Sequence, residues 1–92
     1  MSLEDTALTR EIMREIGRHP VDATYMQVHV SHGVVYLTGR LNKMRGYHQD
    51  TDLEESLHLI AKAIKQKPGI RDVSCEVMLT DSGKRVASGR GL

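Results

Sequence analysis

Three arginines near the start of the chain are spaced four residues apart and could together bind phosphate. Arg10, Arg14 and Arg18 occupy positions i, i+4 and i+8, so on a helix their guanidinium groups lie along one edge. A guanidinium is a planar, permanently charged donor that suits phosphate oxygens, and several together suit the surface of anionic phospholipid. Glu11 and Glu15 flank the row and weaken its field, so an ordinary solvated helix face is the competing interpretation.

A polar segment over residues 42–51 carries a second mixture of basic and apolar groups. Lys43 and Arg45 stand beside Met44 and Tyr47, a combination that suits contact with a membrane surface or a protein. Lys43 and Arg45 therefore join the anion-binding candidates, and Met44 and Tyr47 join the interface candidates. In the alternative, one or both apolar side chains fold down over the core.

The five histidines and the single cysteine form no pattern that favours metal binding or catalysis. His29 and His32 are three positions apart on an expected strand and its turn, and the other three histidines fall on separate elements, whereas a zinc site needs three or four converging ligands. Cys75 alternates in phase with valines, which predicts a buried and unreactive thiol. Because no paired acids, activated nucleophile or phosphate-binding loop is visible, we expect no enzyme, no metal and no cofactor.

Length and composition narrow the classes of protein further. Ninety-two residues make one domain, and thirteen basic against twelve acidic residues leave a net charge of only +1. Three Tyr with no Phe or Trp argue against stacking on single-stranded nucleic acid, and no nucleic-acid partner is expected. No apolar run approaches the roughly 20 residues of a transmembrane helix, and no leader opens the sequence, which indicates a cytoplasmic location.

The elements that must position these groups follow from hydrophobic periodicity. A first helix is predicted over residues 5–16, with Asp5 as N-cap and an apolar stripe of Leu8, Ile12 and Ile16 that Met13 widens. A second helix is predicted over residues 52–67, with acids in its first turn and Pro68-Gly69 after its end.

Residues 26–39 predict a β-hairpin whose register can be derived from the alternation of side chains. A two-residue turn at His32-Gly33 pairs Ser31 with Val34, Val30 with Val35 and Val28 with Leu37. The aliphatic side chains then share one face, whereas a slip of one residue would scatter them over both.

A third strand is predicted over residues 73–79, and the remaining residues 81–92 are Gly-, Ser- and base-rich, which predicts a disordered tail. The order is helix, strand, strand, helix, strand. We therefore expect an α+β domain over residues 1–80, a two-layer sandwich with both helices on one face of a three-stranded mixed sheet.

Two segments carry a resemblance to a known family. The run from Val28 to Gly39 has an alternating strand, a Gly turn, an alternating strand and a closing Gly, and the run from Ile60 to Val73 has an Ala-containing helix, a Pro-Gly turn and the start of a strand. The pattern resembles the BON domain, the small domain of bacterial osmotic-shock and nodulation proteins. His32 stands where the family often has Asp or Asn, and the 42–51 loop is longer than usual.

The resemblance implies a non-catalytic module that binds phospholipid or other partners. Members of the family typically lie in the periplasm behind a leader. If a native leader precedes the given sequence, the expected location is therefore the periplasm. We expect peripheral association with a phospholipid surface. The alternative is protein–protein contact, including a homodimer, through the sheet face that the helices leave uncovered; its candidate residues are His29, Val34, Tyr36 and Met78.

Overall fold

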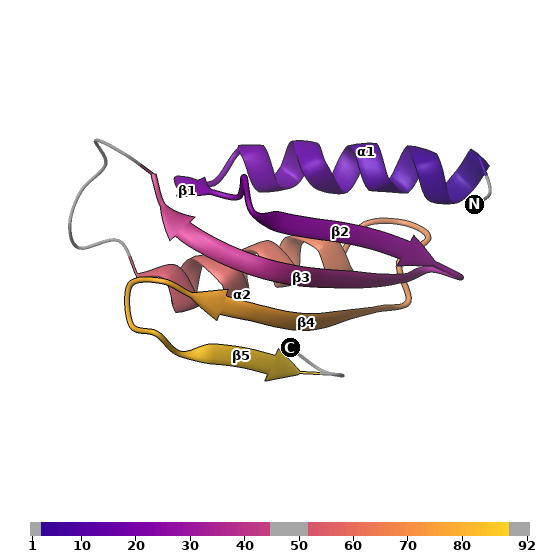
Figure 1. Ribbon diagram of the computed structural model, residues 1–92. Helices are drawn as coiled ribbons and strands as arrows, with labels where there is room; N and C mark the ends of the chain where they lie inside the picture. The colour runs from indigo at the N-terminus through magenta and orange to yellow at the C-terminus, as the bar shows by residue number, and fades with distance from the viewer. Residues whose placement is uncertain (1–2, 45–51, 89–92) are drawn as a thin grey trace.

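Two helices cover one face of a mixed sheet in the computed structural model, which describes residues 3–44 and 52–88. Figure 1 shows α1 lying along β2, with α2 behind the strands β3 and β4. The elements in chain order are α1 (Leu3–Gly17), β1 (Val21–Asp22), β2 (Met26–Ser31), β3 (Val34–Lys43), α2 (Leu53–Lys65), β4 (Asp72–Leu79) and β5 (Arg85–Ser88). The predicted α+β class is confirmed.

Strand β3 is the centre of the sheet. On one edge it pairs antiparallel with β2 and, near its end, with β1, and on the other edge it pairs parallel with β4. Strand β5 then adds antiparallel to the outer edge of β4. Helix α2 makes the crossover between the parallel strands, because such a pair needs a long connection that returns to the same end of the sheet.

The β2–β3 hairpin has the register that its alternating side chains predict. Ser31 pairs with Val34, Val30 with Val35 and Val28 with Leu37. The turn residues His32 and Gly33 have φ values of 52° and 79°, the left-handed pair of a type I′ turn, whose twist matches that of the strands.

Helix α2 begins where its capping residues require. The Asp52 side chain accepts hydrogen bonds from the backbone N–H groups of Glu54 and Glu55, at 3.0 and 3.4 Å. Such a cap satisfies amides that the helix itself leaves without partners. The apolar face of α2 and that of α1 then pack on the core side of the sheet. The core consists of Ile12, Ile16, Val21, Val30, Val35, Leu37, Leu41, Leu53, Leu57, Ile60, Ala61, Ile64, Val73, Cys75, Val77, Leu79 and Val86.

Over the residues that the structure describes, the sheet has five strands rather than the three expected. The two-residue β1 is too short for any alternation to show, and β5 lies within the segment expected to be a disordered tail. Of the described β5 side chains only Val86 is buried, opposite Val77. One buried residue in a polar segment creates no period-two pattern, so the strand could not be predicted from the sequence.

Helix α1 also differs in detail from its prediction. It begins at Leu3, so Asp5 lies inside the helix instead of capping it, and the carbonyl oxygen of Asp5 accepts a hydrogen bond from the Thr9 hydroxyl at 2.7 Å. Met13 was expected to widen the buried stripe, but it is 61% exposed. At about 100° per residue it lies to one side of the line through Ile12 and Ile16.

Candidate functional site

The exposed Met13 stands at an apolar groove between α1 and the neighbouring strands. The groove has a volume of about 190 Å³. Its lining, which we call the methionine groove, is Met13, Ile16, Gly17, Val21, Ala23, Met26, Val28 and Met44. Met44, from the segment singled out in the sequence, is 36% exposed. The fold therefore brings together two exposed methionines that lie far apart in the chain.

The arginines of α1 adjoin this groove. Arg10, Arg14 and Arg18 are all exposed, and the positions of Arg10 and Arg14 on the helix place both on the solvent-facing side of Met13. Arg18 approaches the Glu15 carboxylate at 3.5 Å. Within the described part of the chain, neither Arg10 nor Arg14 forms an ion pair. Both guanidinium groups can therefore bind an external anion.

The basic candidates from the second segment are only partly placed. Lys43 ends β3 and is the pairing partner of Val21, which itself lines the methionine groove. The fold thus brings Lys43 to the same side as α1. Arg45 and Tyr47 lie outside the described residues.

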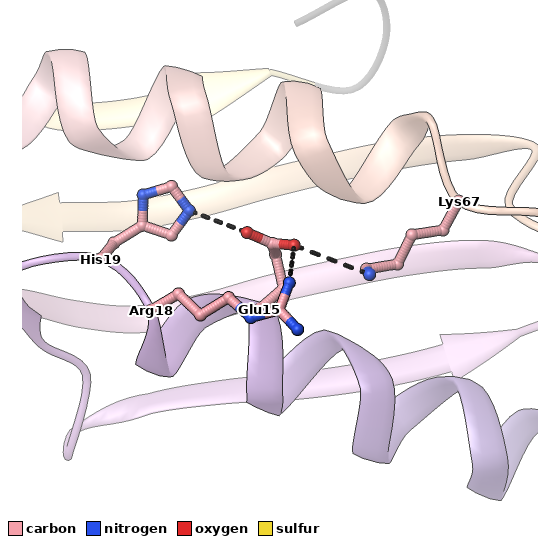
Figure 2. Close-up of polar contacts among 4 residues, drawn as sticks. All are labelled: Glu15, Arg18, His19 and Lys67. Carbon is pink, nitrogen blue, oxygen red and sulfur yellow. Dashed lines mark hydrogen bonds and ion pairs between the residues drawn. The ribbon is translucent and has the colours of Figure 1, made fainter.

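A polar cluster around Glu15 joins the end of α1 to the segment after α2, as Figure 2 shows. The Glu15 carboxylate lies 3.1 Å from Nε2 of His19, 3.5 Å from a guanidinium nitrogen of Arg18 and 3.6 Å from Nζ of Lys67, which follows α2. Because Glu15 is directed toward Lys67, Met13 is directed to the other side of α1, toward the methionine groove.

The polar and charged groups around Glu15 lower the pKa of its carboxyl group. Partial burial alone would raise that pKa, but the hydrogen bond with His19 and the charges of Lys67 and Arg18 outweigh it, so the pKa lies below its usual value. The carboxylate stays ionised at neutral pH and holds the end of α1 in place.

The sheet face opposite the helices is largely polar. The rings of His29 and Tyr36 lie 6.0 Å apart, tilted by 36°, and Tyr36 is 40% exposed. Met78 is 41% exposed and is paired with Arg40. On this face, the pair of Thr38 and Glu76 lies between Met78 and Tyr36.

Ionic contacts also occupy this face. Arg85 forms an ion pair with Glu76, and Arg40 lies over the ring of Tyr25, 5.0 Å from its centroid. The interface candidates therefore form separate points: His29, Tyr36 and the half-buried Val34 at one end, and Met78 at the other. They do not form one apolar patch.

Sequence reasoning missed the most exposed parts of the site. Met13 was assigned to the core, and Tyr25, which is 56% exposed, was not singled out. The angular position of Met13 could have revealed its exposure, because Leu8, Ile12 and Ile16 already define a narrow stripe that excludes it.

The part of the chain that the structure describes contains no cluster of metal ligands, and its cysteine is buried. Over residues 3–44 and 52–88, no three His, Cys, Asp or Glu side chains converge as metal ligands. Cys75 is 2% exposed, and burial raises the pKa of its thiol to about 11, so the prediction that it is buried is confirmed.

The comparisons with known proteins leave the family open. A scan against protein-family models and a search of curated proteins both returned no match. Among the described residues, neither helix has the length and apolar character needed to cross a bilayer.

Proposed function

We propose that this chain is a non-catalytic binding module that attaches to the surface of membranes containing anionic phospholipid. The observation that carries the proposal is Met13, an exposed apolar side chain at the rim of the methionine groove. On its solvent-facing side are Arg10 and Arg14, which form no ion pair with any residue that the structure describes. Peripheral binding combines apolar insertion at the acyl boundary with attraction between bases and anionic headgroups.

The arrangement supplies both contributions from one side of the molecule, where the end of β3 lies beside α1. Met13 and Met44 supply apolar groups at the interface, while Arg10 and Arg14 reach headgroup phosphates. Each base near an anionic surface contributes about 1 kcal/mol, or roughly a fivefold change in affinity. The resemblance to BON domains, for which phospholipid association is proposed, agrees with this assignment and extends it to a periplasmic location if a leader precedes the chain.

Co-sedimentation with vesicles tests the proposal. The protein should pellet with phosphatidylglycerol-containing vesicles, less so as salt rises, and weakly with phosphatidylcholine alone. Replacing Arg10 and Arg14 together by Gln should reduce pelleting more than tenfold, and Met13→Ser should weaken it several-fold. Leu59→Ser is the matched control, because Leu59 is a 52% exposed apolar residue on α2. Equal and negligible pelleting with both vesicle types would contradict the proposal.

A second candidate function, self-association through the uncovered sheet face, has one specific observation in its favour. Tyr36 is an exposed aromatic side chain whose ring lies 6.0 Å from that of His29, at the hairpin end of that face, and tyrosine is enriched where proteins meet. The ion pairs and polar side chains around it favour the membrane proposal over this one.

A further inference from the structure

A polar hollow lies at the tip of the β2–β3 hairpin, on the sheet face opposite the helices. Its volume is about 480 Å³. Its lining is Ser31, His32, Val34, Tyr36, Arg71 and Asp72. The hairpin contributes one wall, and the start of β4 contributes the other.

The backbone N–H and the aliphatic part of the side chain hold Arg71 in this hollow, and the guanidinium group does not. Its backbone N–H donates a hydrogen bond to the carbonyl oxygen of Gly33 at 2.7 Å. A methyl group on Gly33 would lie 3.0 Å from Cγ of Arg71, so the side chain crosses directly over the turn. Among the described residues no carboxylate pairs with its guanidinium, which leaves the five N–H donors open to an external oxyanion.

His32 places a second nitrogen-bearing ring at the rim. Its φ of 52° lies in the left-handed region, where Gly, Asn and Asp are the residues most easily accommodated. Its Nδ1 lies 3.2 Å from the Ser31 hydroxyl oxygen. Histidine is also enriched at such positive-φ positions, and the turn places its imidazole in the same hollow as Arg71.

The acid in the lining is already engaged. Asp72 accepts a hydrogen bond from the Val73 backbone N–H at 2.9 Å and lies 3.9 Å from Nζ of Lys65. Lys65 therefore balances part of the Asp72 charge from outside the hollow. Within the lining, Arg71 is the side chain that carries a permanent positive charge.

From this arrangement we propose that the hollow binds a phosphate group. The guanidinium of Arg71 pairs with two phosphate oxygens. Tyr36 and the hydrogen-bonded pair of Ser31 and His32 supply further donors from the hairpin wall. Donors on several sides suit a tetrahedral oxyanion better than a planar carboxylate. The phosphate can belong to a soluble phosphate monoester or to a lipid headgroup diester. Because the site is separate from α1, its failure would leave the membrane proposal intact.

Amide chemical shifts of the ¹⁵N-labelled protein test this site. Inorganic phosphate and glycerophosphoglycerol, the deacylated headgroup of phosphatidylglycerol, are titrated separately at constant pH and ionic strength, with sodium chloride as the reference titration. Saturable shifts centred on Gly33 and Arg71 are expected with at least one probe. Shifts with phosphate alone identify a monoester site, and shifts with the diester identify a headgroup site. No saturable shift with either probe overturns the proposal.

Substitutions separate the site from general attraction to a basic surface. Arg71→Gln should weaken binding about tenfold, the loss expected for hydrogen bonds from a charged donor. His32→Asn, which suits the left-handed turn and removes the imidazole, should weaken it a few-fold without unfolding the hairpin. Arg85→Gln, on the same sheet face but paired with Glu76, should leave binding unchanged. Equal weakening by Arg71→Gln and Arg85→Gln would contradict a specific site.

Discussion

The carboxylate of Glu15 lies 3.6 Å from the ammonium group of Lys67, a contact that joins the last turns of α1 to the segment after α2. The same carboxylate contacts His19 and Arg18. Glu15 thus links the end of α1 to the segment after α2, on the opposite side of α1 from Met13.

Glu15→Gln should lower the free energy of unfolding by about 1 kcal/mol at neutral pH, because it removes the charge from a partly buried ion cluster. The pKa of Glu15 is lower in the folded protein than its ordinary value of 4.5. The stabilisation is therefore complete above pH 4.5 and disappears as the pH falls through the folded-state pKa. Urea denaturation of wild type and variant across this range measures the difference. Glu11→Gln, an exposed acid on the same helix, should leave the free energy of unfolding at neutral pH nearly unchanged, and an equal loss in the two variants would contradict the assignment.

Gly33→Ala should destabilise the protein more than Gly83→Ala. Both glycines have positive φ, 79° and 72°, so both variants suffer the left-handed penalty of about 1 kcal/mol. Only at Gly33 does the new methyl group meet other atoms, with the carbonyl oxygen of Gly69 at 2.9 Å, whereas nothing lies within 4 Å at Gly83. Thermal unfolding of the two variants gives the comparison. An equal loss in both would show that Arg71 and Gly69 do not pack closely over the hairpin turn.

Val86→Ser should destabilise the protein by about 2 kcal/mol if β5 is an integral strand. Val86 is 8% exposed and is paired with Val77, so the substitution removes buried apolar surface and adds a hydroxyl group to the core. Its neighbour Ala87 is exposed, and Ala87→Ser should change stability by less than about 0.5 kcal/mol. Indistinguishable denaturation midpoints for the two variants would contradict the packing of β5.

Cys75 should react with a thiol reagent only when the protein opens. A pKa raised from 9.0 to about 11 lowers the thiolate fraction at neutral pH about a hundredfold, and burial blocks access as well. The rate of labelling with a chromogenic disulfide should therefore rise steeply across the urea transition. A native-state rate close to that of the unfolded chain would show that Cys75 is accessible.

Tyr36→Asp tests self-association through the uncovered sheet face. If copies meet there, a charge at Tyr36 should shift sedimentation from dimer toward monomer, because the carboxylate would be desolvated in the contact. Leu59→Asp, at a 52% exposed position on α2, is the control. A wild-type protein that remains monomeric at high concentration removes this candidate function.

The sequence predicts those parts of the fold in which several side chains share a periodic pattern. The hairpin register follows from the alternating valines around His32-Gly33, and both turn residues have the positive φ that the turn requires. The start of α2 follows from Asp52 and the two glutamates after it. In each case local chemistry and burial agree on one arrangement.

The parts that sequence could not predict depend on contacts between distant segments. Strand β1 exists because Val21 and Asp22 meet the end of β3, and β5 exists because one valine reaches the core. The candidate site has the same origin: Met44 and Met13 share a groove only after β3 has returned beside α1. The spacing of the arginines identifies Arg10, Arg14 and Arg18 as a row, but it does not predict the ion pair between Arg18 and Glu15.

The parallel pairing of β3 with β4 also constrains the order in which the chain can fold. The β2–β3 hairpin closes through a two-residue turn, an event on the microsecond scale, whereas β4 cannot pair until α2 has carried the chain back across the sheet. Contacts between residues far apart in sequence slow folding, because the loop must close before they form. Substitutions in the hairpin should therefore alter the folding rate, and those in β4 and β5 the unfolding rate. The edge that receives β4 is the surface most open to mispairing with another chain while the protein is being made.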